Sequence, residues 1–169
     1  MKINIITPKH QSEKEKIVKS IYEILEENIL LTLSTIKNNE PYSCSAYYVF
    51  DKNFNLYIWT EKESTHSKNI SKNPLVAVNI ANTSQKFGSE LKGLQMHGGA
   101  KIVSGPELIK AGTLYVARFP KVSKYVKKIK DFVSKEFESE IYKIEIKEIK
   151  LLDEKTFGKE EYRIILIER

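Results

Sequence analysis

Two alternating segments joined by a short polar turn constrain the fold of this chain more than any other feature. Residues 29–36, ILLTLSTI, alternate apolar and hydroxyl side chains, and residues 41–50, PYSCSAYYVF, alternate again after the intervening KNNE. A period of two is typical of strands, so we predict a β-hairpin here. A second turn, DKN at residues 51–53, leads into a third strand, NLYIWT, at residues 55–60.

More strands follow along the chain. After Pro74, LVAVNIAN is rich in β-branched residues and predicts a central strand. Residues 91–104 are also strand-like, but they contain Gly93, Gly98 and Gly99, and glycines inside a strand indicate a bulge or curvature, as in a barrel. Two further strands are predicted at residues 140–153 and 161–169, with Gly158 in the turn between them.

Helices interrupt these strands without alternating regularly with them. We predict an amphipathic helix from Glu13 to Asn28 with Ser12 as its N-cap, and a second helix that opens at Gly105-Pro106-Glu107 and ends before Pro120. A third, lysine-rich helix is predicted over residues 121–137, where the apolar residues fall at helical spacing. Long βαβ repeats are absent, so the predicted class is an α+β barrel or sandwich.

Composition narrows the class of protein. A chain of 169 residues fits one domain, and no apolar run approaches the roughly 20 residues that a membrane span needs. The opening segment has only a short apolar patch before its charges, so we expect no secretory signal and a cytoplasmic location. Cys44 is the only cysteine, and a small buried strand residue is a more ordinary role for it than a nucleophile.

The net charge of +6 permits an anionic partner without identifying one. Much of the excess lies in the lysine-rich segment, where a solvated helix face is the ordinary interpretation and nucleic-acid binding the alternative. No zinc-finger, RRM or KH signature accompanies those lysines, which makes a nucleic-acid partner the weaker hypothesis.

The stretch from Leu56 to Pro74 predicts a strand, a polar turn and a short helix ended by Asn73-Pro74. Hydroxyl and basic side chains gather around the start of that helix, namely Thr60, Ser64, Thr65, His66 and Lys68. A helix start carries unpaired N–H groups and a positive dipole end, so this arrangement suits a phosphate or carboxylate. The sequence therefore predicts an anion cradle here.

Familiar catalytic templates are absent from the sequence. It contains no G-x-S-x-G, P-loop, H-E-x-x-H or Rossmann fingerprint. His10, His66 and His97 are too scattered to show metal-ligand spacing, so no metal site is predicted. What remains is a meandering sheet with a polar cradle and several strand aromatics, which either fill a barrel or meet a flat cofactor.

In its ordered motifs the chain resembles the FMN-binding split β-barrel superfamily of the pyridoxamine 5'-phosphate oxidase type. The family pattern has a first hairpin, a strand ending in Thr, a Ser/Thr and basic turn, then Asn-Leu and Asn-Pro. The residues that fit it here are Thr60, Ser64, Thr65, Asn69, Ile70, Asn73 and Pro74. Where the family commonly has Arg-Lys, this chain has Thr65-His66, with Lys68 close by. The segments Arg118-Phe119-Pro120 and Phe157-Gly158-Lys159 resemble a bacterial YhbP-like branch.

The resemblance implies a fold and an assembly. We expect an α+β split barrel of six to seven antiparallel strands with Greek-key-like order, an N-terminal helix and two helices inserted before the last strands. As one domain over residues 1–169, it would have an arm and helix at 1–28, barrel strands at 29–104, a helical insertion at 105–137 and closing strands at 138–169. The family further implies FMN as cofactor and a homodimer with sites at the subunit interface.

The same resemblance implies roles for particular residues. The phosphate would be held by Thr60, Ser64, Thr65, His66 and Lys68. Gln95 occupies the place where the family often puts a glutamine near the flavin ring. The backbone beside the isoalloxazine would come from Ser43, Cys44, Ser45 and Ala46. Lys159 and Arg163 could reach the site from the closing strands.

The implied function is an FMN-dependent oxidoreductase whose small-molecule substrate and electron donor the sequence leaves open. The C-terminal arginine and histidine pair of the oxidase proper is not visible, so pyridoxamine phosphate oxidation itself is not expected. Two alternatives stay open: a flavin-binding or storage protein without turnover, and a basic nucleic-acid-binding protein with an empty barrel. Heme or a deazaflavin in place of FMN is also left open.

Overall fold

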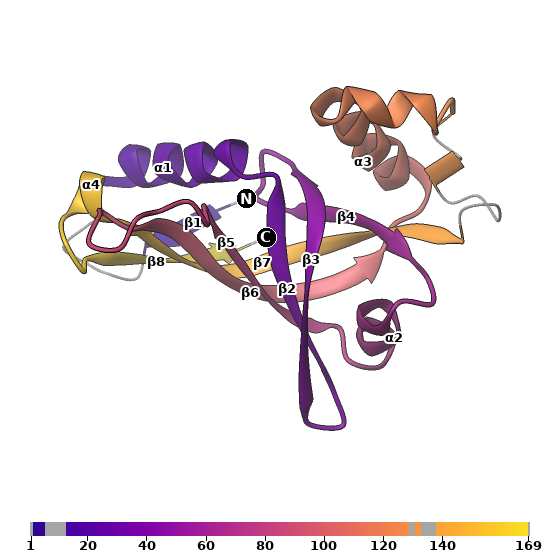
Figure 1. Ribbon diagram of the computed structural model, residues 1–169, viewed down its shortest axis with the longest axis horizontal. Helices are drawn as coiled ribbons and strands as arrows, with labels where there is room; N and C mark the ends of the chain where they lie inside the picture. Colours follow the sequence, from indigo (N-terminus) through magenta and orange to yellow (C-terminus); the bar gives the residue numbers. More distant parts are fainter. Residues whose placement is uncertain (1, 6–12, 129–130, 133–137, 169) are drawn as a thin grey trace.

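The computed structural model describes residues 2–5, 13–128, 131–132 and 138–168, and it has an α+β architecture (Figure 1). Its described strands are β1 (Lys2–Ile5), β2 (Leu30–Lys37), β3 (Glu40–Phe50), β4 (Leu56–Glu61), β5 (Leu75–Ala81), β6 (Lys92–Ile102), β7 (Ser139–Asp153) and β8 (Tyr162–Glu168). Its described helices are α1 (Lys14–Glu27), α2 (Thr65–Lys72), α3 (Gly105–Arg118) and α4 (Glu154–Phe157), with a 3₁₀ segment, η2, at Pro120–Lys124.

The sheet closes on itself. Its strand order is β1-β8-β7-β4-β3-β2-β5-β6, and β7 also pairs with β6, so strands β2 to β7 form an antiparallel barrel from which β8 and then β1 extend. The fifteen residues of β7 make this closure possible, because its first part pairs with β4 and its later part with β8 while β6 runs along both. The predicted α+β split barrel is thereby confirmed.

The predicted hairpin is formed by β2 and β3. Their register runs from Leu30 opposite Tyr47 to Lys37 opposite Glu40, which leaves a two-residue loop. Both loop residues, Asn38 and Asn39, have positive φ angles of 51° and 65°. Asparagine tolerates this left-handed conformation better than most residues, and two such residues give the turn that matches strand twist.

A bulge between β6 and β7 confirms the curvature that the glycines predicted. His97 pairs with Glu148 but Gly98 pairs with Ile146, so Lys147 is an extra residue on β7. A Cβ at Gly98 would lie 2.1 Å from the carbonyl oxygen of Glu145, so only glycine allows this close approach.

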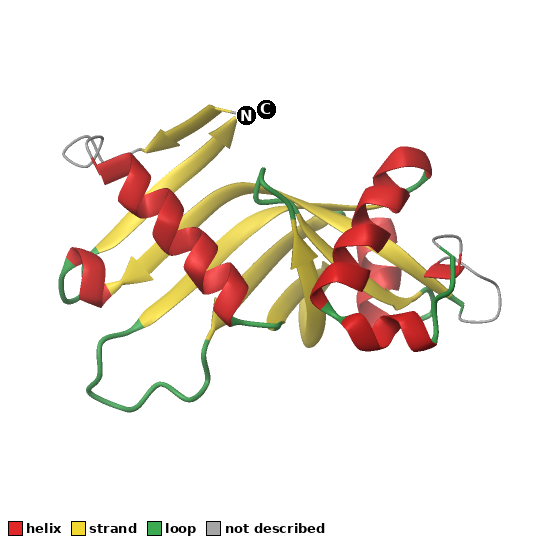
Figure 2. Ribbon diagram, turned by 90° about the horizontal axis from the view of Figure 1, so that it is seen from above, coloured by secondary structure: helices red, strands yellow, loops and turns green. Residues whose placement is uncertain are grey.

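Two apolar cores position the helices. The apolar side of α1, including Ile17, Ile21 and Leu25, is buried in the main core of the barrel. A second core forms where α3 and the segment after it cover Val49, Tyr57 and other residues on the outer side of the sheet. Figures 1 and 2 show α1 and α3 over different ends of the sheet, with α2 below it in the view of Figure 1.

Arg118 ties the end of α3 to the end of α1. Its guanidinium donates hydrogen bonds to the carbonyl oxygens of Leu25 (2.6 Å) and Asn28 (2.7 Å) and lies over the rings of Tyr48 and Phe50. A cation at the C-terminus of α1 satisfies carbonyls that the helix leaves unpaired. This explains structurally why an arginine stands in the Arg-Phe-Pro segment.

Some elements differ from the predictions. The prediction of a lysine-rich helix over residues 121–137 is wrong for the described part of that segment, which has only the 3₁₀ segment η2 followed by turns. Asp131 accepts the N–H groups of Lys127 and Lys128 with its side chain, and Phe132 packs on the Trp59 ring at 5.0 Å, so tertiary contacts replace the helical repeat. Residues 129–130 and 133–137 lie outside the described part.

The sequence did not predict β1, which pairs with β8, or α4, which forms in the expected turn because the Asp153 side chain accepts the N–H of Thr156. The expected N-cap Ser12 lies outside the described residues. Within the described part of the chain, no helix has the length and apolar character to cross a bilayer.

Candidate functional site

The start of α2 is built as the sequence predicts. Ser64 is the N-cap, with extended backbone angles, and its hydroxyl accepts the N–H of Ser67 at 3.4 Å. Of the two candidate caps, Ser64 therefore serves, while Thr65 is the first helical residue and is exposed. The helix ends at Asn73, whose N–H bonds to the carbonyl of Asn69.

His66 is the hub of this region. Its Nε2 lies 2.7 Å from the hydroxyl of Thr60 and 3.1 Å from that of Ser64, and its Nδ1 lies 3.4 Å from the sulfur of Cys44. One imidazole therefore joins the end of β4, the cap of α2 and the middle of β3. We call Thr60, Ser64, His66 and Cys44 the cradle.

The cradle is electrically neutral near pH 7. Burial lowers the pKa of the His66 imidazole and raises the pKa of the Cys44 thiol, so neither group is charged there. A neutral imidazole has one donor and one acceptor nitrogen, which suits an S–H donated to Nδ1 and an Nε2–H donated to a hydroxyl oxygen. The pair thus lacks the thiolate that nucleophilic chemistry requires.

The neighbouring lysines are engaged elsewhere. Lys68 forms an ion pair with Glu63 at 3.0 Å, with both side chains largely exposed, and Lys62 pairs with Glu140 at 3.4 Å. The permanent cation nearest to His66 in sequence therefore contacts a surface carboxylate. This leaves hydroxyls, the imidazole and the N–H groups of the helix start as the donors of the cradle.

The β3 segment beside the cradle has a free backbone edge. In the described structure β4 pairs with β3 only at Tyr48–Phe50, whereas β2 pairs along the whole of residues 40–47. On the side away from β2, the stretch Ser43–Ala46 therefore presents backbone groups that no strand pairs. Cys44 is the member of this stretch that belongs to the cradle, through its contact with His66, while Ser43 and Ser45 are exposed on the outer face.

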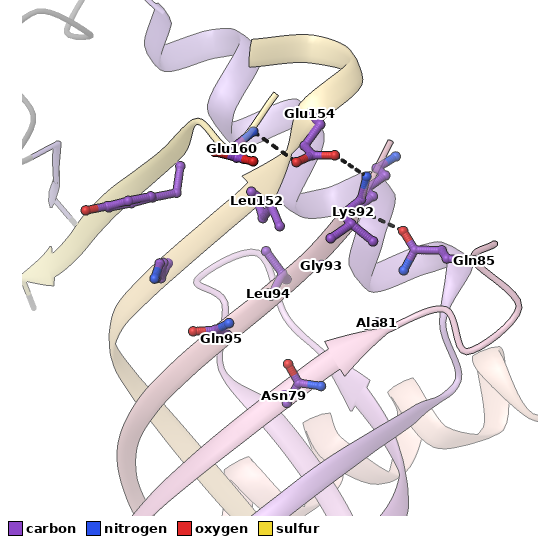
Figure 3. Close-up of a pocket in the computed structure, with 13 residues that line it drawn as sticks. Asn79, Ala81, Gln85, Lys92, Gly93, Leu94, Gln95, Leu152, Glu154 and Glu160 are labelled. Carbon is purple, nitrogen blue, oxygen red and sulfur yellow. Dashed lines mark hydrogen bonds between the residues drawn. The ribbon is translucent and has the colours of Figure 1, made fainter. Parts of the chain in front are cut away.

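Gln95 lies in a different place, on the outer face of β6, where it lines a pocket of about 370 Å³ (Figure 3). Its cross-strand neighbours are Asn79 on β5 and Lys150 on β7. Lys159 follows α4, next to the pocket residue Glu160. Within one chain, the predicted residues therefore form two groups: the cradle, and the pocket that contains Gln95.

Arg163, the other closing-strand candidate, is committed to a structural role. Its side chain is buried, bonds to Glu13 at 3.0 Å, pairs with Glu161 at 3.4 Å and lies over the Phe157 ring. It contacts neither the cradle nor Gln95.

Sequence reasoning missed two features of the outer face. His97 lies two residues after Gln95 on the same face, and its Nδ1 is 3.8 Å from Glu148 Oε1. Lys150 lies over the ring of Tyr162, with its Nζ 4.5 Å from the ring centroid. The period of two in β6 could have placed His97 beside Gln95, but their partners on β7 depend on the pairing register, which the glycines of β6 do not specify.

The outer face of β2, β3 and β5 is free of charged residues. Its exposed or half-exposed residues are Leu30, Thr32, Ser34, Ile36, Pro41, Ser43, Ser45, Tyr47, Leu75, Ala77, Asn79 and Ala81, whereas the charged Lys37 and Glu40, opposite each other at the hairpin turn, belong to the alternate set of positions. In a chain with 30% charged residues, such a surface is unusual for solvent contact.

Known proteins resemble this chain in sequence. A family model described as pyridoxamine 5'-phosphate oxidase matches residues 17–153. The UPF0306 protein of Yersinia pseudotuberculosis serotype O:3 (strain YPIII) is 34% identical over 101 residues, which covers 59% of this chain and 68% of that protein.

Solved structures share the fold. A heme-binding protein from Mycobacterium smegmatis superposes with a TM-score of 0.69 at 12% identity, over 87% of this chain and 56% of that one. A putative pyridoxamine 5'-phosphate oxidase from Listeria innocua superposes with a TM-score of 0.60 at 19% identity, over 80% of this chain and 98% of that one. At these identities the likeness establishes the fold alone.

Proposed function

We propose, because this chain belongs to the pyridoxamine 5'-phosphate oxidase family, that it binds FMN and acts as an FMN-dependent oxidoreductase on a small-molecule substrate. The observation that carries the proposal is the convergence of two hydroxyls, from Thr60 and Ser64, on one imidazole at the start of α2. The substrate and the electron donor are not assigned.

The donors of the cradle fit a phosphate group. The first N–H groups of a helix have no intrahelical acceptor, and the dipole of α2 favours an anion at this end. Thr60 adds a hydroxyl donor, and His66 adds an Nε2–H that can turn from the Thr60 and Ser64 hydroxyls to a phosphate oxygen. The Ser64 hydroxyl itself donates to the carbonyl oxygen of Glu61 and would have to turn from it to reach a phosphate. Because His66 is neutral and Lys68 pairs with Glu63, the site would hold the phosphate mainly through hydrogen bonds.

The free edge of β3 fits the flavin ring. The pyrimidine side of an isoalloxazine carries alternating hydrogen-bond donors and acceptors, and unpaired backbone groups of Ser43–Ala46 can match them. When bound, FMN supplies the redox chemistry at its ring, and the protein binds, orients and shields it. Because the cofactor would supply the redox chemistry, the cradle residues need no charged acid–base pair.

A homodimer belongs to the same proposal. The uncharged outer face of β2, β3 and β5 is suited to a second copy of the chain, which would bring the partner's pocket residue Gln95 toward the flavin ring. A glutamate for Thr32, at the centre of this face, should dissociate the dimer, whereas Thr83→Glu in an exposed loop should not. A monomeric wild-type protein at micromolar concentration, measured by light scattering, would contradict the assembly.

A cytoplasmic location of the protein stays a prediction.

Turnover separates an enzyme from a storage protein. The FMN-loaded protein is mixed anaerobically with NADH or NADPH, and bleaching of the flavin spectrum is followed over time. Reduction faster than that of free FMN supports an oxidoreductase. Bound FMN that NADH and NADPH reduce no faster than they reduce free FMN supports the non-catalytic flavin-binding alternative.

A second candidate is heme binding, which one contact favours. Glu148 Oε1 lies 3.8 Å from Nδ1 of His97, whose side chain is 57% exposed, so a small movement would let the carboxylate accept the Nδ1–H while Nε2 faces a ligand. Imidazole is a common axial ligand of heme iron, and a carboxylate on its other nitrogen is a frequent supporting partner. A shifted Soret band on addition of hemin that His97→Ala abolishes would support this candidate, and an unshifted band would remove it.

A further inference from the structure

The pocket that contains Gln95 has an apolar floor. Ala81, Gly93 and Leu152 are cross-strand neighbours on β5, β6 and β7, and Leu152 pairs in turn with Tyr162 on β8. A Cβ at Gly93 would lie 3.3 Å from the Ala81 side chain, so the absence of a side chain at this position leaves the surface between Ala81 and Leu152 uncovered. The result is an apolar shelf on the outer face, which Ala81, Gly93 and Leu152 form in Figure 3. Tyr162, the partner of Leu152, lines the pocket at the β8 end of this shelf.

A polar row runs beside this shelf. Asn79, Gln95 and Lys150 are the next set of cross-strand neighbours on the same three strands, and all three line the pocket. Figure 3 shows Asn79 and Gln95 projecting from adjacent strands beside the pocket. Two amides and an ammonium thus follow one edge of an apolar surface.

The charge of Lys150 is not neutralised by a carboxylate in the described structure. Its ammonium lies over the Tyr162 ring and forms no ion pair with an acidic group among the described residues. Of the other charges that line the pocket, Lys92 pairs with Glu23 and Glu27, Glu154 accepts two backbone N–H groups, and Glu160 adds one further carboxylate. A half-buried ammonium beside an apolar shelf is suited to an organic anion.

We propose that this pocket binds a small planar aromatic carboxylate. The ring would lie on the shelf of Ala81, Gly93 and Leu152, and the carboxylate would meet the ammonium of Lys150 and the amide of Gln95. A pocket volume of about 370 Å³ is in the range of small-molecule sites. Binding of this ligand does not require FMN. Only its role as the substrate class rests on the proposed function, because Gln95 would then lie between the flavin and the ligand.

Binding of 2-naphthoate tests the pocket on the full chain, by calorimetry with and without FMN. We expect Lys150→Met to weaken naphthoate binding about tenfold, equivalent to about 1.4 kcal/mol. Lys147→Met, the same change at an exposed position of β7, should alter it less than about twofold. Lys150→Arg keeps the charge and should retain binding, which also guards against a variant that fails to fold.

A neutral probe separates charge recognition from apolar contact. Binding of 2-naphthamide should be the same in the wild-type protein and Lys150→Met. Equal naphthoate affinity in Lys150→Met and wild type, or no binding at millimolar concentration, would overturn the inference. FMN binding without naphthoate binding would sink this inference and leave the proposed function standing, whereas naphthoate binding without FMN binding would do the reverse.

Discussion

Replacing His66 by alanine is the perturbation to which the cradle should respond most. The imidazole bonds to two hydroxyls and a thiol, so its loss removes a donor for the phosphate and leaves the Thr60 and Ser64 hydroxyls without their shared partner. A hydrogen bond to a charged group contributes about 1.5–3 kcal/mol, so FMN affinity should fall roughly tenfold to a hundredfold. Lys68→Ala removes an exposed pair with Glu63 and should cost no more than about fivefold.

Titration of flavin fluorescence with each purified variant measures these affinities, and circular dichroism at the same concentrations checks that the fold is kept. In the double variant the two effects should multiply, since the two side chains have separate partners and their free energies add. The reasoning is refuted if Lys68→Ala weakens FMN binding more than His66→Ala does. That result would mean that the lysine leaves Glu63 to hold the phosphate.

Three further predictions concern stability. Gly98→Ala should destabilise the protein by about 3 kcal/mol in urea unfolding, because its Cβ would clash with the carbonyl of Glu145, whereas Gly99→Ala, whose Cβ would have 4.0 Å of room, should be nearly neutral. Burial lowers the folded-state pKa of His66, so its contribution is full above the ordinary value of about 6.5 and is lost as pH falls through the depressed pKa. His66→Gln should flatten that acid-side drop in Tm, and an unchanged profile would place the titration elsewhere. Arg118→Lys should cost about 2 kcal/mol, because an ammonium cannot reproduce both the carbonyl contacts and the ring stacking; an equal midpoint to wild type would contradict this.

The parts of the fold that could be predicted are those with local signals. Alternation fixed the β2–β3 hairpin, and a hydroxyl before a helical pattern identified the Ser64 cap. The lysine-rich segment shows the limit, because its helical spacing was genuine but the Asp131 side chain and the Trp59 ring favour turns instead. Such contacts join residues far apart in sequence, and propensity cannot anticipate them.

The candidate site divides in the same way. Thr60, Ser64 and His66 lie within one short stretch, and a helix start brings them together as predicted. Contact of Cys44 with His66 depends on the tertiary packing of α2 against β3, and the row from Asn79 to Lys150 depends on sheet register across the bulge. Neither relation has a signature in the order of residues along the chain.

The visible absorption spectrum of the purified protein, followed by mass analysis of what denaturation releases, tests the central claim most directly. The account predicts the bands of oxidised flavin and a released mass equal to that of FMN, or their appearance when FMN is added to colourless protein. A protein that stays colourless and leaves the fluorescence of added FMN unchanged would contradict it.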